Sequence, residues 1–221
     1  MLNADSYMKE LIAALRATFG DRLIYVGLQG SYLRGEATET SDIDAMVVID
    51  RMTVQDLANY RNIISVLPEP EKSCGFICGR EELAHWNPLE LCHLIHTTRD
   101  EYGKLAPLLP ACDERDLRSF IQLSIGNLYH ALCHSYVHGD PNENRRMLLQ
   151  LCKGVFFILQ NLHYLRTGIF CSAKQELLSQ LEGCDHTVME LCICLSKAER
   201  YHFASAFETM LDWCQQTLRT L

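Results

Sequence analysis

The chain has 221 residues, of which 48% are hydrophobic and 22% charged, and its formal net charge is -8. This apolar content can form a sizeable core, which excludes a disordered or fibrous protein. The negative charge disfavours nonspecific binding to nucleic acid or anionic membrane, and no apolar run approaches the roughly 20 residues that span a bilayer. We therefore expect partners other than nucleic acid or membrane.

Cysteine usage bears on the cellular compartment. There are eleven cysteines, an odd number, and the first twenty residues form an amphipathic pattern instead of a charged and then apolar leader. The pairs Cys74 with Cys78 and Cys192 with Cys194 lack the two-residue spacing of a zinc knuckle. The sequence therefore predicts a protein of the reducing cytoplasm without structural zinc.

Two helices are predicted in the first seventy residues. An apolar period of 3.6 residues indicates a helix that starts near Asp5 or Ser6 and ends at Gly20. Thr53 and Asp56 form a capping-box pattern that starts another helix. The apolar positions are Met8, Leu11, Ile12, Leu15 and Phe19 in the first helix, and Leu57, Tyr60, Ile64 and Leu67 in the second, which Pro68 ends.

Strand patterns occur only in the first half of the chain. Short runs rich in strand formers predict strands at 22–28, 43–50 and 73–79, and a further run at 91–97 predicts a fourth. Beyond about residue 110 no convincing strand pattern follows. The sequence therefore predicts an α+β domain over residues 1–108.

Helical patterns fill the rest of the chain. Residues 143–167 are apolar nearly all round, which is typical of the central helix of a bundle, and Gly168 ends this segment. Ser172 with Gln175 predicts the start of another helix. Two further apolar stripes are Leu117, Ile121, Ile125, Leu128 and Leu132, and Phe203, Phe207, Met210, Leu211, Cys214 and Leu218. We therefore expect an all-α helical bundle over residues 109–221.

The segment GSYLRGEATETSDIDAMVV, residues 30–48, carries the strongest functional signal. Asp42 and Asp44 fall on one face of a strand, about 7 Å apart at their Cα atoms, close enough to share one divalent ion. Mg²⁺ is held typically by one or two carboxylates together with substrate phosphates. Gly30 and Ser31 follow the preceding strand, where backbone N–H groups and a hydroxyl can donate to phosphate oxygens.

Neither half of this pattern is specific alone, because aspartate is common in helix caps and Gly-Ser in turns. The combination resembles the signature of the DNA polymerase β-like nucleotidyltransferase superfamily, particularly of its minimal and kanamycin-type, antibiotic-modifying members. The matching positions are Gly30, Ser31, Arg34, Gly35, Ser41, Asp42 and Asp44. The resemblance is specific over about residues 22–50, plausible to about 105 and only architectural beyond.

The resemblance implies a reaction and a set of roles. Asp42 and Asp44 would be the catalytic, Mg²⁺-binding residues, and a nucleoside monophosphate would move from a triphosphate to a hydroxyl, with release of pyrophosphate. Nucleotide binding would involve Gly30, Ser31, Arg34, Ser41 and Lys153, the last from the helical half, as in kanamycin-type enzymes. From the residues alone, Lys153 could instead extend to the surface.

The sequence departs from the family in one respect. Family members usually carry a third carboxylate on the next strand, but residues 73–79 contain no acid, and Glu71 and Glu81 lie at or beyond its ends. A general base typically contributes 10²- to 10⁴-fold in rate. Acids of the helical half that could replace it are Asp113, Glu114, Asp116, Asp140 and Glu143.

Other candidate motifs have structural alternatives. His130, His134 and His138 recur every four residues and could bind metal, an acceptor or phosphate, or could form a hydrogen-bonded interdomain or dimer surface. Arg80 and His85 have the spacing of HEPN ribonucleases but fall in the α+β half, which disfavours that interpretation.

The sequence therefore predicts a Mg²⁺-dependent nucleotidyltransferase that moves a nucleoside monophosphate, AMP from ATP, to a small-molecule or protein hydroxyl. A homodimer is a further expectation from kanamycin-type relatives. The competing hypothesis is a nucleotide-binding module that has lost turnover and acts as a regulator or complex partner, because the third acid is missing.

Overall fold

A computed structural model describes residues 2–91, 93–197 and 201–221, without the side chain of Leu89. The chain forms two compact units, Met1–Cys112 and Asp113–Leu221. The first unit contains a sheet with flanking helices and the second is helical, so the α+β fold followed by a helical bundle is confirmed. No helix in the described ranges is long and apolar enough to cross a membrane.

The first unit is built on a mixed four-stranded sheet in the order β3-β2-β1-β4. The strands are β1 (Leu23–Gln29), β2 (Ile43–Ile49), β3 (Ser73–Gly79) and β4 (Arg99–Tyr102). The helices are α1 (Ala4–Phe19), α2 (Gly30–Leu33), α3 (Val54–Ser65), α4 (Arg80–Ala84), α5 (Pro88–Leu91) and α6 (Leu94–Thr97). β1 pairs antiparallel with β2 and with β4, whereas β2 and β3 are parallel. This topology places the N-terminal end of β2 beside the N-terminal end of β3.

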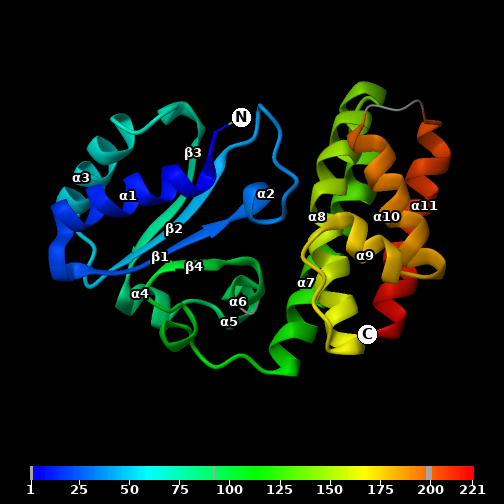
Figure 1. The fold of residues 1–221 in the computed structure, drawn as a ribbon. Helices are drawn as coiled ribbons and strands as arrows, with labels where there is room; N and C mark the ends of the chain where they lie inside the picture. The colour runs from blue at the N-terminus through cyan, green and yellow to red at the C-terminus, as the bar shows by residue number, and fades with distance from the viewer. Residues whose placement is uncertain (1, 92, 198–200) are drawn as a thin grey trace. The chain divides into compact units, whose positions relative to one another are not determined.

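Helices cover both faces of this sheet. In Figure 1, α1 and α3 lie on one side of it, and α4, α5 and α6 lie on the other. Strand β2 is buried on both faces: Ile43, Ala45 and Val47 contact the core under α1, while Met46 and Val48 contact the opposite core. Within β2 only Asp44 is partly exposed, and the exposed Asp42 directly precedes the strand, so both acids lie where the start of β2 meets solvent.

Local capping explains where the first helices start. Asn3, and not Asp5 or Ser6, caps α1, because its side chain accepts the Ser6 N–H at 2.9 Å. The predicted capping box of Thr53 and Asp56 is present at the start of α3. That helix ends at Ser65, three residues before Pro68.

The prediction of a strand at 91–97 is wrong. The described residues of this segment are helical at Leu91 and at Leu94–Thr97, and the fourth strand is β4, two residues further on. Its sequence, RDEY, lacks the run of apolar, strand-forming residues on which the prediction relied. β4 forms the edge of the sheet beside β1, where polar side chains are tolerated.

The second unit packs four long helices with one short helix, α9. The helices are α7 (Glu114–His138), α8 (Pro141–Thr167), α9 (Lys174–Gln180), α10 (Gly183–Ser196) and α11 (Phe203–Thr220). The predicted stripe from Leu117 to Leu132 is buried, and α8 ends at Gly168, whose φ of 73° suits glycine. The segment after Ser172 divides into α9 and α10, a division that the sequence pattern did not indicate.

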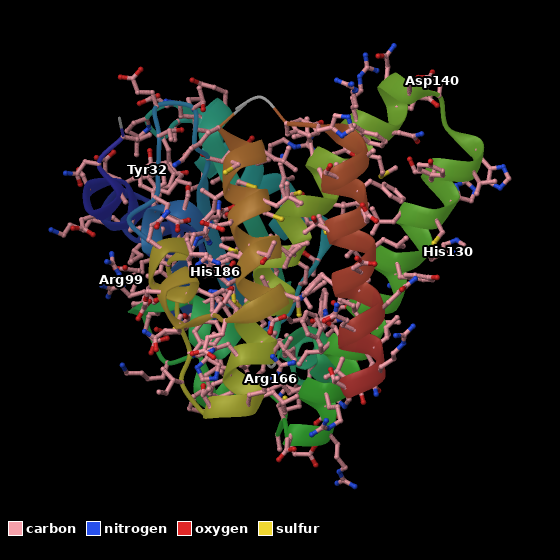
Figure 2. All side chains as sticks on the ribbon, turned by 90° about the vertical axis from the view of Figure 1, so that its right-hand side faces the viewer. Tyr32, Arg99, His130, Asp140, Arg166 and His186 are labelled. Carbon is pink, nitrogen blue, oxygen red and sulfur yellow. The ribbon has the colours of Figure 1, made fainter. Side chains whose placement is uncertain are left out.

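A buried carboxylate joins three helical elements of this unit. Asp185 on α10 accepts hydrogen bonds from Trp213 Nε1 on α11 at 2.7 Å and from Arg166 on α8 at 2.6 Å. Figure 2 labels Arg166 and, on α10, His186, which pairs with the exposed Glu190. Asp185 is 7% exposed, so its loss leaves the Trp213 N–H buried without an acceptor.

We expect Asp185→Ala to destabilise the protein by about 2 kcal/mol, because the unpaired indole N–H adds its desolvation cost and half-exposed Arg166 can rehydrate. Glu190→Ala on the same helix removes an exposed pair and should change stability by less than about 0.5 kcal/mol. Urea unfolding followed by circular dichroism measures both. Equal effects of the two substitutions would contradict the role given to Asp185.

Candidate active site

The register of the sheet brings three side chains into one row. Asp44 on β2 is paired in register with Gln29 on β1 and with Cys74 on β3. Residues in register on neighbouring strands point to the same face of a sheet. Gln29, whose Nε2 donates to Thr98 Oγ1 at 2.8 Å, therefore flanks Asp44 on one side, and Cys74 flanks it on the other.

The two predicted acids lie at the entrance of this row. Asp42 is exposed and Asp44 is partly buried, and both carboxylates contribute negative charge at the Cys74 thiol. Within the described residues, no lysine or arginine forms an ion pair with either acid. Two carboxylates that share a neighbour without a protein cation are a suitable site for an external cation.

Gly30 makes room for this acid pair. It begins α2 with φ of 71°, and a Cβ built on it would overlap the Asp44 carboxylate. Glycine is therefore required twice, for the backbone conformation and for the space that Asp44 fills. Gly35 has a similar φ of 69°, but nothing lies within 4 Å of a Cβ built there.

This difference gives a matched pair of substitutions. Gly30→Ala should displace Asp44 and weaken magnesium-dependent nucleotide binding at least about tenfold, beyond a backbone cost of about 1 kcal/mol. Gly35→Ala introduces the same type of backbone strain without the overlap, and we expect it to leave binding within about twofold. Calorimetric titration with ATP and Mg²⁺ measures both, and equal losses would show that backbone strain alone is responsible.

Cys74 stands in register with Asp44 on β3, and this strand contains no acid. Desolvation raises the pKa of its thiol, and a hydrogen bond to Asp44 and the negative charges of Asp44 and Asp42 raise the pKa further. A thiol with a raised pKa is protonated at neutral pH and neither ligates a hard cation nor accepts a proton readily. In this row the chain therefore presents two carboxylates and one neutral thiol.

The other residues of the first unit that are predicted to bind nucleotide lie between β1 and β2. Ser31 lies in α2, and Arg34 forms an ion pair with Glu36 at 3.1 Å. The Ser41 hydroxyl accepts the Thr38 N–H at 2.8 Å, so it shapes the turn that precedes Asp42. These contacts give Arg34 and Ser41 structural roles in the loop beside the acid pair.

Lys153 belongs to the second unit, on α8. Its side chain is exposed, and it lines a pocket of about 300 Å³ within that unit. Lys174 also lines this pocket, with its ammonium 5.8 Å from the ring centroid of Phe156. Two cationic side chains at one pocket favour an anionic group there.

The candidate bases of the second unit form helix caps or, in the case of Glu114, an ion pair. Asp113 and Asp116 form the capping box of α7, Asp140 and Glu143 form that of α8, and Glu114 pairs with Arg118. Arg115 lowers the pKa of Asp113, and the backbone N–H groups of Glu143 and Asn142 lower the pKa of Asp140. A carboxylate with a lowered pKa is a weaker general base. These five acids therefore have structural explanations.

The side chains around the acid pair limit which metal ion could bind there. Among the described residues, no group of three or more histidine, cysteine or acidic side chains converges to hold an ion. Asp42 and Asp44 alone provide hard oxygen ligands, and Mg²⁺ commonly takes one or two carboxylates with phosphates and water in its other positions. The residues present therefore fit a magnesium ion that arrives with its nucleotide.

The α+β unit and its acid pair define a nucleotidyltransferase domain, and comparison with known proteins agrees. The family described as Nucleotidyltransferase domain matches residues 8–74. A protein of Methanocaldococcus jannaschii, provisionally named a protein adenylyltransferase, is 35% identical over 78 residues, which cover 32% of this chain and 78% of that protein. The chain belongs to the DNA polymerase β-like nucleotidyltransferases, a class of transferase enzymes.

A solved structure extends the likeness in fold to the helical half. The crystal structure of spectinomycin adenyltransferase from Enterococcus faecialis, with ATP and spectinomycin, superimposes with a TM-score of 0.60. The superposition covers 98% of this chain and 100% of the spectinomycin enzyme, and the two sequences are 14% identical. At this identity the match supports the fold, in agreement with the predicted architecture.

Sequence reasoning missed one neighbour of a predicted site residue in each unit. Gln29 was given no role, although the register places it beside Asp44, and Lys174 was not recognised as a neighbour of the Lys153 pocket. The position of Gln29 as the last residue of a strand, directly before Gly30 and Ser31, was the available signal. No comparable signal in the sequence marks Lys174.

Proposed function

We propose that this chain transfers AMP from ATP to a hydroxyl group of an acceptor in a Mg²⁺-dependent reaction. The observation that carries the proposal is the pair of carboxylates, Asp42 and Asp44, at the entrance of β2, without a protein counterion in the described residues and next to Gly30, where a Cβ would overlap the Asp44 carboxylate. Adenylyl transfer is favoured by the names of the two relatives, one of which is described with bound ATP.

Each predicted site residue has a separate role in the proposed reaction. Asp42 and Asp44 would hold the ion, which when bound neutralises phosphate charge and polarises the phosphoryl group. Backbone N–H groups at Gly30 and Ser31 would donate to the terminal phosphates, with Arg34 and Ser41 supporting the loop. Lys153 would contribute a further cation from the second unit.

The bonds and the proton balance in this scheme. The acceptor oxygen forms a bond to the α-phosphorus of ATP, the bond from that phosphorus to the bridging oxygen of the β-phosphate breaks, and pyrophosphate leaves. The hydroxyl proton passes to solvent or to a base. Because the residue of β3 beside Asp44 is the neutral thiol of Cys74, we propose that β3 supplies no general base and that turnover is slow.

Two classes of acceptor are consistent with the relatives. The name of the spectinomycin enzyme favours an antibiotic, and the name of the archaeal relative favours a protein side chain. The eleven cysteines support a reducing, cytoplasmic location, and a homodimer remains a prediction that light scattering can test.

Cys74 also favours a second candidate function. A chain that keeps the acid pair and lacks the third acid could bind nucleotide and metal without turnover, as a regulator or complex partner. This alternative shares the binding site and differs only in the chemical step.

Incubation with ATP, GTP, CTP or UTP, Mg²⁺ and a panel of acceptors separates the two functions. The panel contains aminocyclitol and aminoglycoside antibiotics and a protein fraction, and pyrophosphate is measured. We expect release with ATP that requires Mg²⁺ and one acceptor. Metal-dependent ATP binding without release across the panel would support the module and contradict the transferase.

A further inference from the structure

The C-terminal half of α7 carries three histidines that the proposed reaction does not use. His130, His134 and His138 follow one another at intervals of one helical turn, and all three are exposed. Figure 2 shows His130 at the outer edge of α7, with Asp140 at the start of the next helix, α8. These rings are therefore accessible to an ion from solvent.

The ring separations distinguish the two neighbouring pairs. The centroids of His134 and His138 are 4.7 Å apart, and those of His130 and His134 are 5.9 Å apart. Imidazole nitrogens at about 2.1 Å from one ion, with an angle of about 90–110° between them, put the ring centroids about 4.5–5.2 Å apart. The His134 and His138 pair has this separation already, whereas the other pair exceeds it.

Little competes with an ion for these nitrogens. In the described part of the chain, none of the three rings forms a hydrogen bond or an ion pair. The adjacent polar groups have partners of their own: Ser135 bonds Asn144, and Asp140 and Glu143 cap α8. The pair also lies in the last turns of α7, where the helix dipole favours a cation.

We propose that His134 and His138 form an exposed two-imidazole chelate for one divalent transition-metal ion, such as Ni²⁺, Cu²⁺ or Zn²⁺. The protein supplies two ligands, and water or a group of another molecule supplies the rest. Imidazole selects these metals, whereas the carboxylates of Asp42 and Asp44 suit Mg²⁺. The two sites therefore differ in metal class, and this proposal does not depend on the proposed transferase activity.

Titration of untagged full-length protein with Ni²⁺ tests the chelate. Thiols such as Cys74 and Cys184 are first alkylated with iodoacetamide, and excess Mg²⁺ is added to compete with Ni²⁺ for carboxylates such as Asp42 and Asp44. We expect His134→Ala and His138→Ala each to weaken Ni²⁺ binding at least about tenfold, because one imidazole remains from a chelating pair. His130→Ala should leave binding within about twofold.

Controls separate loss of ligands from loss of fold. His202→Ala removes an exposed histidine from another helix end and should have no effect, and His134→Gln repeats the central substitution with a polar side chain. Circular dichroism melts verify that each variant is folded. Unchanged Ni²⁺ binding in His134→Ala would overturn the proposal, and so would equal losses in His130→Ala and His138→Ala.

Discussion

Asp44→Asn is expected to lower the rate of pyrophosphate release about 10³-fold. Asparagine keeps the shape that fits against Gly30 but removes the charge that neutralises the cation, so binding of the metal and its action on the phosphates are both lost. Release is followed with ATP, Mg²⁺ and the acceptor identified by the panel. The melting temperature should change little, because Asp44 has no protein counterion among the described residues.

Asp50 provides the matched control at the opposite end of β2. It forms an exposed ion pair with Arg22 at 2.9 Å, and its side chain is 50% exposed. Asp50→Asn changes charge and shape in the same way as Asp44→Asn, and we expect it to retain activity within about twofold. A comparable loss at both positions would show that the effect follows net charge instead of the acid pair.

Cys74→Asp is expected to raise the rate about 10²-fold, the second large effect. The substitution places a carboxylate on β3 in register with Asp44, and a general base contributes typically 10²- to 10⁴-fold in rate. Three neighbouring acids repel one another without a cation. The melting temperature of this variant should therefore fall in chelator and recover when Mg²⁺ is added.

Cys74→Ser distinguishes the effect of adding a carboxylate from the effect of removing the thiol. Serine is neutral and close in size, so its rate should stay within about threefold of the unchanged chain. A large loss in Cys74→Ser would show that the thiol itself takes part in the reaction. No gain in Cys74→Asp would show that the base comes from another position or that the chemical step is not limiting.

The sequence predicted the parts of the molecule that local patterns control. β1, β2 and β3 fall within one residue of their predicted bounds, and the predicted capping box of Thr53 and Asp56 is present. The stripe of α7 is buried as the 3.6-residue period requires. Local signals of this kind act over a few residues and can be recognised without the tertiary structure.

Pairing between distant segments could not be predicted in this way. The lack of an acid on β3 was visible in the sequence, but the position of Cys74 opposite Asp44 depends on strand order and register. The edge strand β4 was missed because its sequence is polar, and the helical segment before it was mistaken for a strand because it is apolar. Cap residues such as Asn3 depend on side-chain geometry that several nearby residues could provide.

The central claim is that Asp42 and Asp44 bind a nucleotide through its metal ion. Calorimetric titration of the full chain with ATP, with Mg²⁺ and with excess chelator, tests it directly, using the double variant Asp42→Asn with Asp44→Asn for comparison. We predict that the unchanged chain binds ATP at least about tenfold more tightly with Mg²⁺ and that the double variant loses this difference. Equal ATP affinity with and without Mg²⁺ in the unchanged chain would contradict the account.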